Sequence, residues 1–585
     1  MRRVRTSSYH IRRDDLLRLT SLIALSILVC AASNVGAQEL FTYNRIVEGL
    51  AIPWEIDLDD DGKFWVTERS GIFSRLDPVT GEKKVLLDLR DSVELTIENG
   101  MLGFVMHPQF PAEPYVYVGY VLKGDTASKR VIARFTFRND SLVEPLRLVE
   151  IDTAGYIHQG SRMMISNDNK LFVTMGDGDW PEKAQDPTSL RGKLLRFNLD
   201  GSIPEDNPIP GSPIWSLGHR NQQGVTMLPD GRIFTAEHGS VIEDEVNEIF
   251  KGGNYGWPFS EGPCDTPDER DSCRKYSSIE PVWSTGEVTY GVSELVFYNH
   301  DLYPVLQNSL LLVSLKQSTL FQLKFDSART KIVETIPILP FAAGRLRAIL
   351  VTKSGRIFLT TTNQDQGKYE PFPLEGDDAI IELVPVAEGA QPKYRALQDT
   401  VAMNGMVGEM SFGRFPIAND GDAPLTIENV WYDGWTNNFF NAQWRLPLVV
   451  LPKSSIDVMT GFLPTELGSF EDRLRIKVKG IDEPFVYVIY GTAVASSVAE
   501  QSGSSFELYP NPFTDAVTFR ASEPSRISVA ITDVLGRTVW RGSAEDAASV
   551  VWDGRVFGAG SCPPGSYHAV VTINCMTIGT LLLRR

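Results

Sequence analysis

Cysteine and histidine are both scarce in this chain of 585 residues, which contains five cysteines and seven histidines. No Cys-x-x-Cys motif occurs, and its absence argues against a zinc ribbon and against a thiol redox centre. Long apolar runs are scarce too. The run Leu19–Ala32 is too short for a comfortable membrane span and no stretch of 18 apolar residues follows it, so we expect no stable membrane insertion of the mature chain.

Positive charge is in deficit, with 56 Lys and Arg against 74 Asp and Glu and a formal net charge of −18. Such an acidic chain is a poor partner for nucleic acid and for anionic lipid. A cluster of cations in this background therefore calls for an explanation.

The ends of the chain indicate export. Residues 1–38 are predicted to be a signal peptide, because six arginines accompany the apolar run, which ends in the small-residue exit GAQ. A membrane anchor is the alternative. After loss of Cys30, four cysteines remain in two closely spaced pairs, Cys264/Cys273 and Cys562/Cys575, which predict two disulfides formed in an oxidising compartment.

A turn followed by a β-rich run recurs between about Phe41 and Leu383. The clear copies occupy residues 59–71, 166–178, 228–239 and 352–363, and looser copies occupy 115–121 and 308–316. Six copies at intervals of roughly 45–80 residues predict an all-β fold with a six-bladed β-propeller over residues 39–386. An eight-bladed propeller and a pair of sandwiches are the alternatives.

Two smaller β-sandwich domains are predicted to follow. Residues 387–497 show short strand patterns between Asn-Asp-Gly and proline-bounded turns, and their phrasing resembles immunoglobulin-like modules of surface proteins. Residues 498–505 form a predicted Ser-rich linker. Residues 506–585, with YPNPF and DVLGR, resemble the C-terminal sorting domain of the type IX secretion system. That resemblance implies the secretion machinery as a partner and the cell surface or medium as the destination. A plain second sandwich is the alternative.

Polar residues in turns and at strand ends are the candidate site residues, because these positions surround the mouth of a propeller channel. His158 lies in IHQGSR, and Asp177 ends a predicted strand in GDGD. An imidazole can take a proton from an alcohol near neutral pH, and a carboxylate can orient it. A histidine held for structure alone is the alternative.

Cations form a second candidate group. Arg220 and Asn221 belong to GHRNQQG, Arg345 and Arg347 alternate along GRLRAI and share a face, and Lys316 ends a strand. Arginine binds carboxylates through two parallel hydrogen bonds. Each residue alone fits an ordinary surface ion pair, whereas together they predict a site for a ligand with several negative charges.

Oxygen ligands form the third group. Carboxylates and glycine-rich turns gather in one segment, and this donor set suits calcium better than zinc or copper. The residues concerned are Glu237, Gly239, Ser240, Glu243, Asp244, Glu245, Tyr255 and Gly256. A solvated acidic turn is the alternative.

At these motifs the chain resembles the glucose/sorbosone dehydrogenase family, the soluble quinoprotein sugar dehydrogenases that use pyrroloquinoline quinone (PQQ) and calcium. The resemblance runs from about Gly49 through ENGMLG, HQGSR, GDGD, GHRNQQG, EHG, DEVN and NYGWP to GRLRAI. It covers the predicted propeller and neither of the two later modules.

The resemblance implies a role for each candidate. His158 matches the base that takes the proton of the anomeric hydroxyl, Asp177 its carboxylate partner, and Arg220 the group facing the reacting quinone oxygens. The residues implied to bind the cofactor are Glu98, Asn221, Lys316, Arg345 and Arg347.

The resemblance also implies two calcium sites. The carbonyls of Gly239 and Ser240 match the pair that holds the active-site ion, and Glu245, Tyr255 and Asp265 match a second, structural site. His238 receives no role. The chain departs from the family where EHGS replaces EHGP or EQGP and where HQGSRM replaces HxGGRL.

The resulting hypothesis is an exported quinoprotein that oxidises an aldose at C1 to a lactone and passes electrons to an external acceptor. Two alternatives stay open: a calcium-stabilised propeller that only binds, and a calcium-dependent lactonase. The cation set argues against the lactonase, because hydrolysis needs no grip on a tricarboxylate.

Overall fold

The computed structural model describes residues 40–124, 127–152, 155–340, 343–365, 372–434, 438–441, 446–494, 506–509, 516–532, 538–555, 565–573 and 576–584. The predicted signal peptide, the predicted linker, Cys562 and Cys575 lie outside these ranges. The chain divides into two compact units between Ala493 and Val494.

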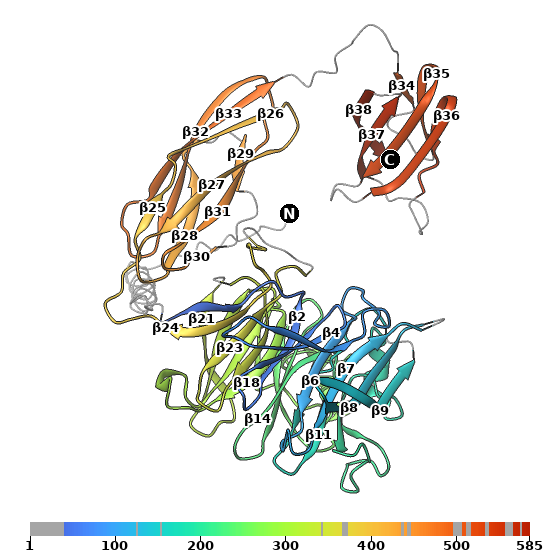
Figure 1. Ribbon diagram of the computed structural model, residues 1–585, viewed down its shortest axis with the longest axis vertical. Coiled ribbons are helices and arrows are strands. Elements are labelled where there is room, and N and C mark those ends of the chain that lie inside the picture. The colour runs from blue at the N-terminus through green and yellow to red at the C-terminus, as the bar shows by residue number, and fades with distance from the viewer. Residues whose placement is uncertain are drawn as a thin grey trace, which may run out of the picture. The chain divides into compact units, whose positions relative to one another are not determined.

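Six four-stranded antiparallel sheets occupy the described part of residues 41–385 (Figure 1). They are β2–β5 (Pro53–Leu58, Phe64–Glu68, Ile72–Leu76, Lys83–Asp88), β6–β9 (Met101–Met106, Tyr115–Leu122, Lys129–Arg138, Ser141–Asp152), β10–β13 (Met163–Ile165, Lys170–Met175, Lys193–Asn198, Ile214–Leu217), β14–β17 (Gln222–Met227, Ile233–Glu237, Glu245–Ile249, Trp283–Ser284), β18–β21 (Val292–Tyr298, Ser309–Ser314, Thr319–Phe325, Ile332–Pro340) and β22–β24 (Leu346–Val351, Ile357–Thr361, Ile380–Pro385) with β1 (Phe41–Val47).

The sheets form a closed ring. The first strand of each sheet contacts the first strand of the next, from β2 through β6, β10, β14 and β18 to β22, and β22 contacts β2 again. The ring is closed in the last sheet by β1, which pairs with β24 so that Phe41 lies opposite Pro385. Closure leaves few exposed sheet edges and is the defining feature of a β-propeller. The predicted fold class, all-β with a propeller, is confirmed.

Each sheet contains one copy of the recurring sequence phrase. The six copies form the second strands β3, β7, β11, β15, β19 and β23. The turn before β3 shows why the phrase is repeated: the Asp59 carboxylate accepts hydrogen bonds from the amides of Asp61 and Lys63, and it thereby fixes the bend that starts the strand.

Neighbouring sheets pack through large apolar side chains. Between the β2–β5 and β6–β9 sheets, Phe73 lies 4.5 Å from Phe104 and 5.7 Å from Trp65 between ring centroids, and all three are buried. Aromatic contacts of this kind add about 0.5–1.5 kcal/mol to the burial of the rings. The resulting rigid ring holds the loops that carry the polar residues.

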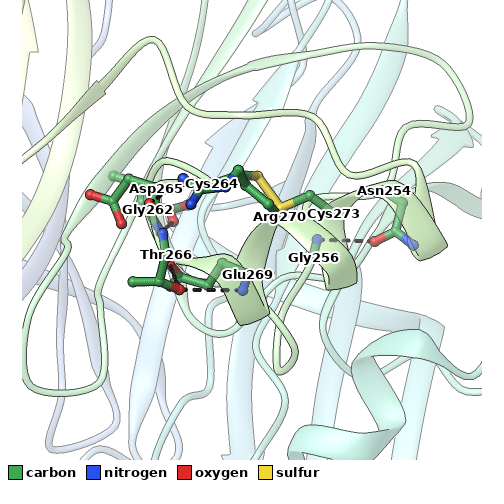
Figure 2. Close-up of a disulfide and its surroundings, with 10 residues drawn as sticks. Asn254, Gly256, Gly262, Cys264, Asp265, Thr266, Glu269, Arg270 and Cys273 are labelled. Atoms are coloured by element: carbon green, nitrogen blue, oxygen red, sulfur yellow. Dashed lines mark hydrogen bonds between the residues drawn. A yellow bond between two sulfur atoms is a disulfide. The ribbon is translucent and has the colours of Figure 1, made fainter.

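One insertion between β16 and β17 contains the helix α2 (Pro267–Tyr276), which the sequence analysis did not predict. A capping box starts it: Thr266 accepts from the Glu269 amide, and Glu269 accepts from the Thr266 amide. The predicted Cys264–Cys273 disulfide is present and ties the helix to the segment before it (Figure 2). Two short 3-10 helices, Pro181–Gln185 and Pro304–Leu306, complete the described helical residues of the propeller.

Residues 394–494 form two further antiparallel sheets. One has the order β25 (Tyr394–Ala396), β27 (Ser411–Asn419), β31 (Ser454–Phe462), β29 (Phe439–Asn441), and the other has the order β26 (Thr400–Met406), β33 (Phe485–Val494), β32 (Gly468–Val478), β28 (Leu425–Tyr432), β30 (Leu448–Val450). Their alternating inward residues, among them Phe415, Val458, Leu474 and Tyr487, make one buried core, as in a β-sandwich.

The second unit contains β34 (Phe506–Tyr509), β35 (Val517–Thr532), β36 (Thr538–Trp552), β37 (Gly565–Ile573) and β38 (Met576–Arg584). These strands follow the order β34-β35-β37-β38, and β36 also pairs with β35. Phe519 and Trp552 lie at the centre of its core. None of the helices described anywhere in the chain has the length and apolar content needed to span a membrane.

Candidate active site

The predicted site residues meet at one end of the propeller because of how its strands run. The first two strands of each sheet are antiparallel, so the start of the first strand and the end of the second strand lie at the same end. His158 and Arg220 precede first strands (β10, β14), while Asp177 and Lys316 follow second strands (β11, β19). Residues far apart in sequence are thereby brought to one mouth of the ring.

His158 and Asp177 form a buried hydrogen-bonded couple. Nδ1 of His158 lies 2.7 Å from Oδ1 of Asp177, and both side chains are shielded from solvent. The indole Nε1 of Trp257 donates to the other Asp177 oxygen at 2.9 Å. Burial raises the pKa of Asp177, but the hydrogen bond and charge of His158 and the donors Asp179 and Trp257 outweigh it, so the pKa lies below its ordinary value. Because Asp177 holds Nδ1, Nε2 is the nitrogen that can accept a proton.

The loop carrying His158 is held in a left-handed conformation, with φ 57°. Its amide donates to the Glu98 carboxylate at 2.6 Å, and its carbonyl accepts from the Arg130 guanidinium at 3.1 Å. Arg130 is fully buried and also donates to Gln159 and to the carbonyl of Gly176. Burial lowers the pKa of Arg130 to about 9. The backbone is thus fixed from both sides, which keeps the imidazole aligned on Asp177.

A cavity of about 190 Å³ lies beside this couple, and we refer to it as the cationic cavity. All five residues predicted to bind the cofactor line it: Glu98, Asn221, Lys316, Arg345 and Arg347. Arg69 adds a fourth cation and Asp365 a second carboxylate, so four positive groups face two negative ones. The lining therefore carries a formal excess of two positive charges in a protein of net charge −18.

Asp365 sits between two of these arginines. Both oxygens of its carboxylate accept from Nη1 of Arg69 at 2.9 Å. One of them also accepts from Nη2 of Arg347 at 3.5 Å. Burial lowers the pKa of Arg347 to about 10, with Asp365 opposing that shift and neighbouring arginines adding to it. The buried Nε atom of Arg347 has no hydrogen-bond partner among the described residues. An unsatisfied buried donor on a residue that lines a cavity suits an anionic ligand.

A second ionic cluster packs against Trp54 in the wall of the cationic cavity. Trp54 lines the cavity, and the Arg162 guanidinium lies 4.2 Å from its ring centroid. Arg162 pairs with Glu55 and, at 3.3 Å, with Glu294, and it donates to the carbonyl of Gln223. Burial raises the pKa of Glu294 to about 8 against the pull of Arg162, and the charge of Glu55 adds to the rise.

A much smaller cavity, of about 10 Å³, lies next to Arg220, and we call it the acidic cavity. Four carboxyl groups line it, those of Glu237, Glu243, Glu245 and Glu261. Burial, and after it the charge of Glu237, raise the pKa of Glu245 to about 8. The acidic cavity is about large enough for one water molecule.

The metal candidates are only partly gathered there. Gly239, Glu245 and Tyr255 line the acidic cavity, whereas Ser240 and Asp265 do not. Ser240 donates through its amide and hydroxyl to Glu261. Asp265 lies beside the disulfide, where its carbonyl accepts from Arg270 (Figure 2). Across the described residues no three His, Cys, Asp or Glu side chains are already arranged around a common metal position.

Arg220 and His238 connect the two cavities. His238 lines both, and its Nδ1 donates to the Gly239 carbonyl at 2.6 Å. Arg220 lines the acidic cavity, and its Nη1 donates to the His238 carbonyl at 2.9 Å. Burial lowers the pKa of His238, with Asp244 opposing and Lys316 adding to the shift. The sequence analysis gave His238 no role, and the structure places it in the wall between the cavities.

Sequence reasoning missed Arg69, Asp365, Trp54, Glu261 and the linking position of His238. A signal existed for three of them. Arg69 and Asp365 follow the second strands β3 and β23 as Asp177 follows β11, and residues at these places lie at the mouth of the ring. Trp54 is the second residue of the first strand β2, as Arg347 is of β22. Aligning the six sheets on their strands would have identified all three, whereas Glu261 lies in the insertion between β16 and β17 and has no such signal.

Known proteins resemble this chain over the same region. Residues 50–370 match the glucose/sorbosone dehydrogenase family, and residues 507–550 match the secretion system C-terminal sorting domain. Quinoprotein glucose dehydrogenase B of Acinetobacter calcoaceticus is 34% identical over 252 residues, which are 38% of this chain and 53% of that protein. This chain thus spans about half the length of that relative. The aldose sugar dehydrogenase of Escherichia coli is 27% identical over 362 residues, covering 57% of this chain and 94% of the relative.

A solved structure gives the same result. The PQQ-bound aldose sugar dehydrogenase of Streptomyces coelicolor superimposes with a TM-score of 0.52 and 27% identity, covering 59% of this chain and 98% of that protein. The match is confined to about the length of the propeller, and the sorting domain at the other end indicates export. By the extent of the family match, the chain belongs to the glucose/sorbosone dehydrogenase family and carries a secretion sorting domain at its C-terminal end.

Proposed function

We propose that this protein is an exported PQQ-dependent aldose dehydrogenase, which oxidises C1 of a sugar to a lactone with calcium as Lewis acid. The observation that carries the proposal is the adjacency of two features. The backbone amide of His158, whose imidazole is hydrogen-bonded to Asp177, donates to Glu98, which lines a cavity with excess positive charge. A base beside an anion-binding pocket is what hydride removal from an alcohol toward a bound anionic acceptor requires.

The residues fit the cofactor. PQQ is a rigid, planar tricarboxylate, and Arg69, Lys316, Arg345 and Arg347 offer guanidinium and ammonium donors around one cavity. The buried Nε of Arg347 gives a donor that the described protein groups leave unsatisfied. Bound there, the quinone supplies the hydride acceptor.

The protein's own contribution is proton transfer and alignment. Nε2 of His158 takes the proton of the anomeric hydroxyl, and Asp177 stabilises the imidazolium that forms. The low pKa of Asp177 keeps it ionised while His158 changes charge. The Arg220 backbone lies beside this couple, because its carbonyl accepts from the Asp177 amide at 2.8 Å. Its guanidinium lies 5.4 Å from the ring centroid of Trp257, which donates to Asp177, and we propose that it stabilises negative charge there.

Calcium is proposed for the acidic side of the site. Carboxylate and carbonyl oxygens are its preferred ligands. One buried oxygen of Glu243 lacks a hydrogen-bond partner among the described residues, and the Gly239 carbonyl faces His238. Because the described residues contain no preassembled group of three His, Cys, Asp or Glu ligands, we propose that ion binding turns these oxygens toward a common centre. The assignments of Gly239, Ser240, Glu245, Tyr255 and Asp265 stay part of this proposal.

The proposal extends to the rest of the chain. The limits 39–386, 387–497 and 506–585 are proposed for the propeller, the immunoglobulin-like sandwich and the sorting domain, preceded by a signal peptide at 1–38. The reaction takes two electrons from each sugar, so an external electron acceptor must reoxidise the cofactor.

Reconstitution tests the function. Purified protein is titrated with PQQ and Ca²⁺, read by quinone absorbance and by dye reduction with a set of aldoses. We expect saturable quinone binding and sugar-dependent dye reduction. Lactone hydrolysis without quinone would indicate the lactonase instead. Quinone-independent sugar binding that His158→Ala leaves intact, with no turnover, would indicate a binding propeller.

A further inference from the structure

Three exposed or part-exposed apolar side chains lie on loops next to the His158–Asp177 couple and are not used by the proposed chemistry. They are Ile97, Tyr156 and Trp180, which we together call the shelf. Ile97 lines the cationic cavity and is 49% exposed, Tyr156 is 66% exposed, and Trp180 is part-exposed. The three come from loops of two neighbouring sheets, before β6, before β10 and after β11.

Short contacts connect the shelf to the couple. The amide of Glu98, which follows Ile97, donates to the carbonyl of Tyr156 at 3.2 Å. The amide of Trp180 donates to the carbonyl of Asp177 at 3.3 Å. Gly155 packs against the Trp180 ring so closely that a Cβ there would lie 3.2 Å from Cζ3 and 2.3 Å from the Gly178 carbonyl. The three segments that carry the shelf residues are therefore neighbours, one of them at the cavity and the other two next to His158 and Asp177 in the chain.

The backbone that presents Tyr156 is fixed although its ring is exposed. The carbonyl of Gly155 accepts from Asn99 at 3.0 Å and from Gln159 at 3.2 Å, and the Ile157 carbonyl accepts from Gln159 at 3.2 Å. Trp180 is held as well, because the Arg191 guanidinium lies 4.3 Å from its ring centroid. Exposed aromatic rings on an ordered backbone lose little entropy on binding and are typical of recognition surfaces.

From this arrangement we infer that the shelf binds the sugar rings beyond the one oxidised, so the substrate class is a reducing oligosaccharide rather than a free monosaccharide. The inference rests on the proposed function. With the quinone in the cavity, the oxidised ring lies at His158, and the rest of the sugar must extend outward over adjacent surface. The apolar C–H faces of pyranose rings pack on aromatic rings, whereas Ile97 and the two rings offer few hydrogen bonds to a lone monosaccharide. Contacts to remote rings also raise turnover of the bound substrate.

The test compares sugars of increasing length with the full chain loaded with PQQ and Ca²⁺. We measure kcat/KM for glucose, maltose, maltotriose, cellobiose and cellotriose in wild type, Tyr156→Ala and Trp180→Ala. In at least one series we expect kcat/KM to rise with length in wild type. Each substitution should lower the trisaccharide value about tenfold and the glucose value less than twofold. Tyr156→Phe keeps the ring and should retain the wild-type profile. Phe250→Ala, an exposed aromatic at the opposite end of the propeller, is the matched control.

If the substitutions lower kcat/KM equally for glucose and for the trisaccharide, or if kcat/KM of the wild type does not rise with sugar length, the shelf does not bind the additional rings. Tryptophan fluorescence with methyl maltoside and methyl cellobioside, which cannot be oxidised at C1, separates it from the proposed function. If no sugar is oxidised but these glycosides bind and Tyr156→Ala weakens their binding, the dehydrogenase function is contradicted and sugar binding by the shelf is supported. If sugars are oxidised and neither glycoside binds, sugar binding by the shelf is contradicted and the dehydrogenase function is supported.

Discussion

The two cavities at the propeller mouth have opposite charge although they share a wall. The cationic cavity has four basic groups against two carboxylates, while the acidic cavity has four carboxyl groups against Arg220. His238 lines both. The net charge of the chain does not predict this separation, because one chain with a formal net charge of −18 contains both sites. An anionic cofactor and a hard cation can therefore bind side by side, each among groups of the opposite sign.

In the proposed function both cavities bind ligands, and proton transfer is left to the His158–Asp177 couple. We therefore expect the largest effect from His158→Ala, which should lower kcat by about 10²–10⁴-fold because the general base is lost. Quinone binding, followed by absorbance, should change little. Asp177→Asn should give a loss of similar size, since the amide cannot stabilise the imidazolium. A loss of quinone binding in His158→Ala would place this residue in the cavity instead.

Removing one cation should weaken the cationic cavity alone. Lys316→Met keeps the length of the side chain and removes its charge, and a hydrogen bond to a charged group contributes about 1.5–3 kcal/mol. We expect the Kd for PQQ to rise about 10–100-fold in an absorbance titration, with calcium binding unchanged. Lys324→Met is the matched control, because Lys324 belongs to the same sheet and pairs with Glu334 on the surface. Equal effects of the two substitutions would contradict the cavity assignment.

The acidic cavity should respond in the opposite way. At 100 times its Kd, calcium stabilises the folded protein by about 2.7 kcal/mol, which is measurable as a rise in Tm. Glu243→Gln removes the carboxylate whose buried oxygen has no hydrogen-bond partner among the described residues, and it should reduce that rise at the same calcium concentration. Glu334→Gln, at an exposed position, should keep it. Equal calcium responses in both variants would show that the ion binds elsewhere.

The smallest effect concerns the ionic cluster that packs against Trp54 in the wall of the cationic cavity. The pKa of Glu294 is raised to about 8, so the folded protein binds a proton that the unfolded chain releases above its ordinary pKa. Stability contributed by that proton is full at low pH and is lost as pH rises from about 4.5 to 8. Glu294→Gln should flatten the fall in Tm between pH 5 and 8.5. An unchanged slope would show that Glu294 ionises normally in the fold.

How far the sequence predicts the fold is clear from the repeated phrase. Its six copies all proved to be second strands, because a turn fixed by residues such as Asp59 followed by alternating apolar positions is a local signal. Helix α2 was missed although its capping box Thr266–Glu269 is also local, since the insertion was assigned to loops. Glu261 reached the site through packing of the insertion between β16 and β17, which no local pattern reports.

The sequence by itself determined the all-β class, the repeat positions, the Cys264–Cys273 pair and the residue types that meet at the mouth. It placed five cofactor candidates in one set without showing that they share one cavity with Arg69 and Asp365. Only the tertiary structure separated the charges into two cavities and brought the segment with Tyr156 into contact with the segments of Ile97 and Trp180. The reason is that strand pairing is encoded over a few neighbouring residues, whereas the mouth is assembled by ring closure, which brings together loops that lie hundreds of residues apart.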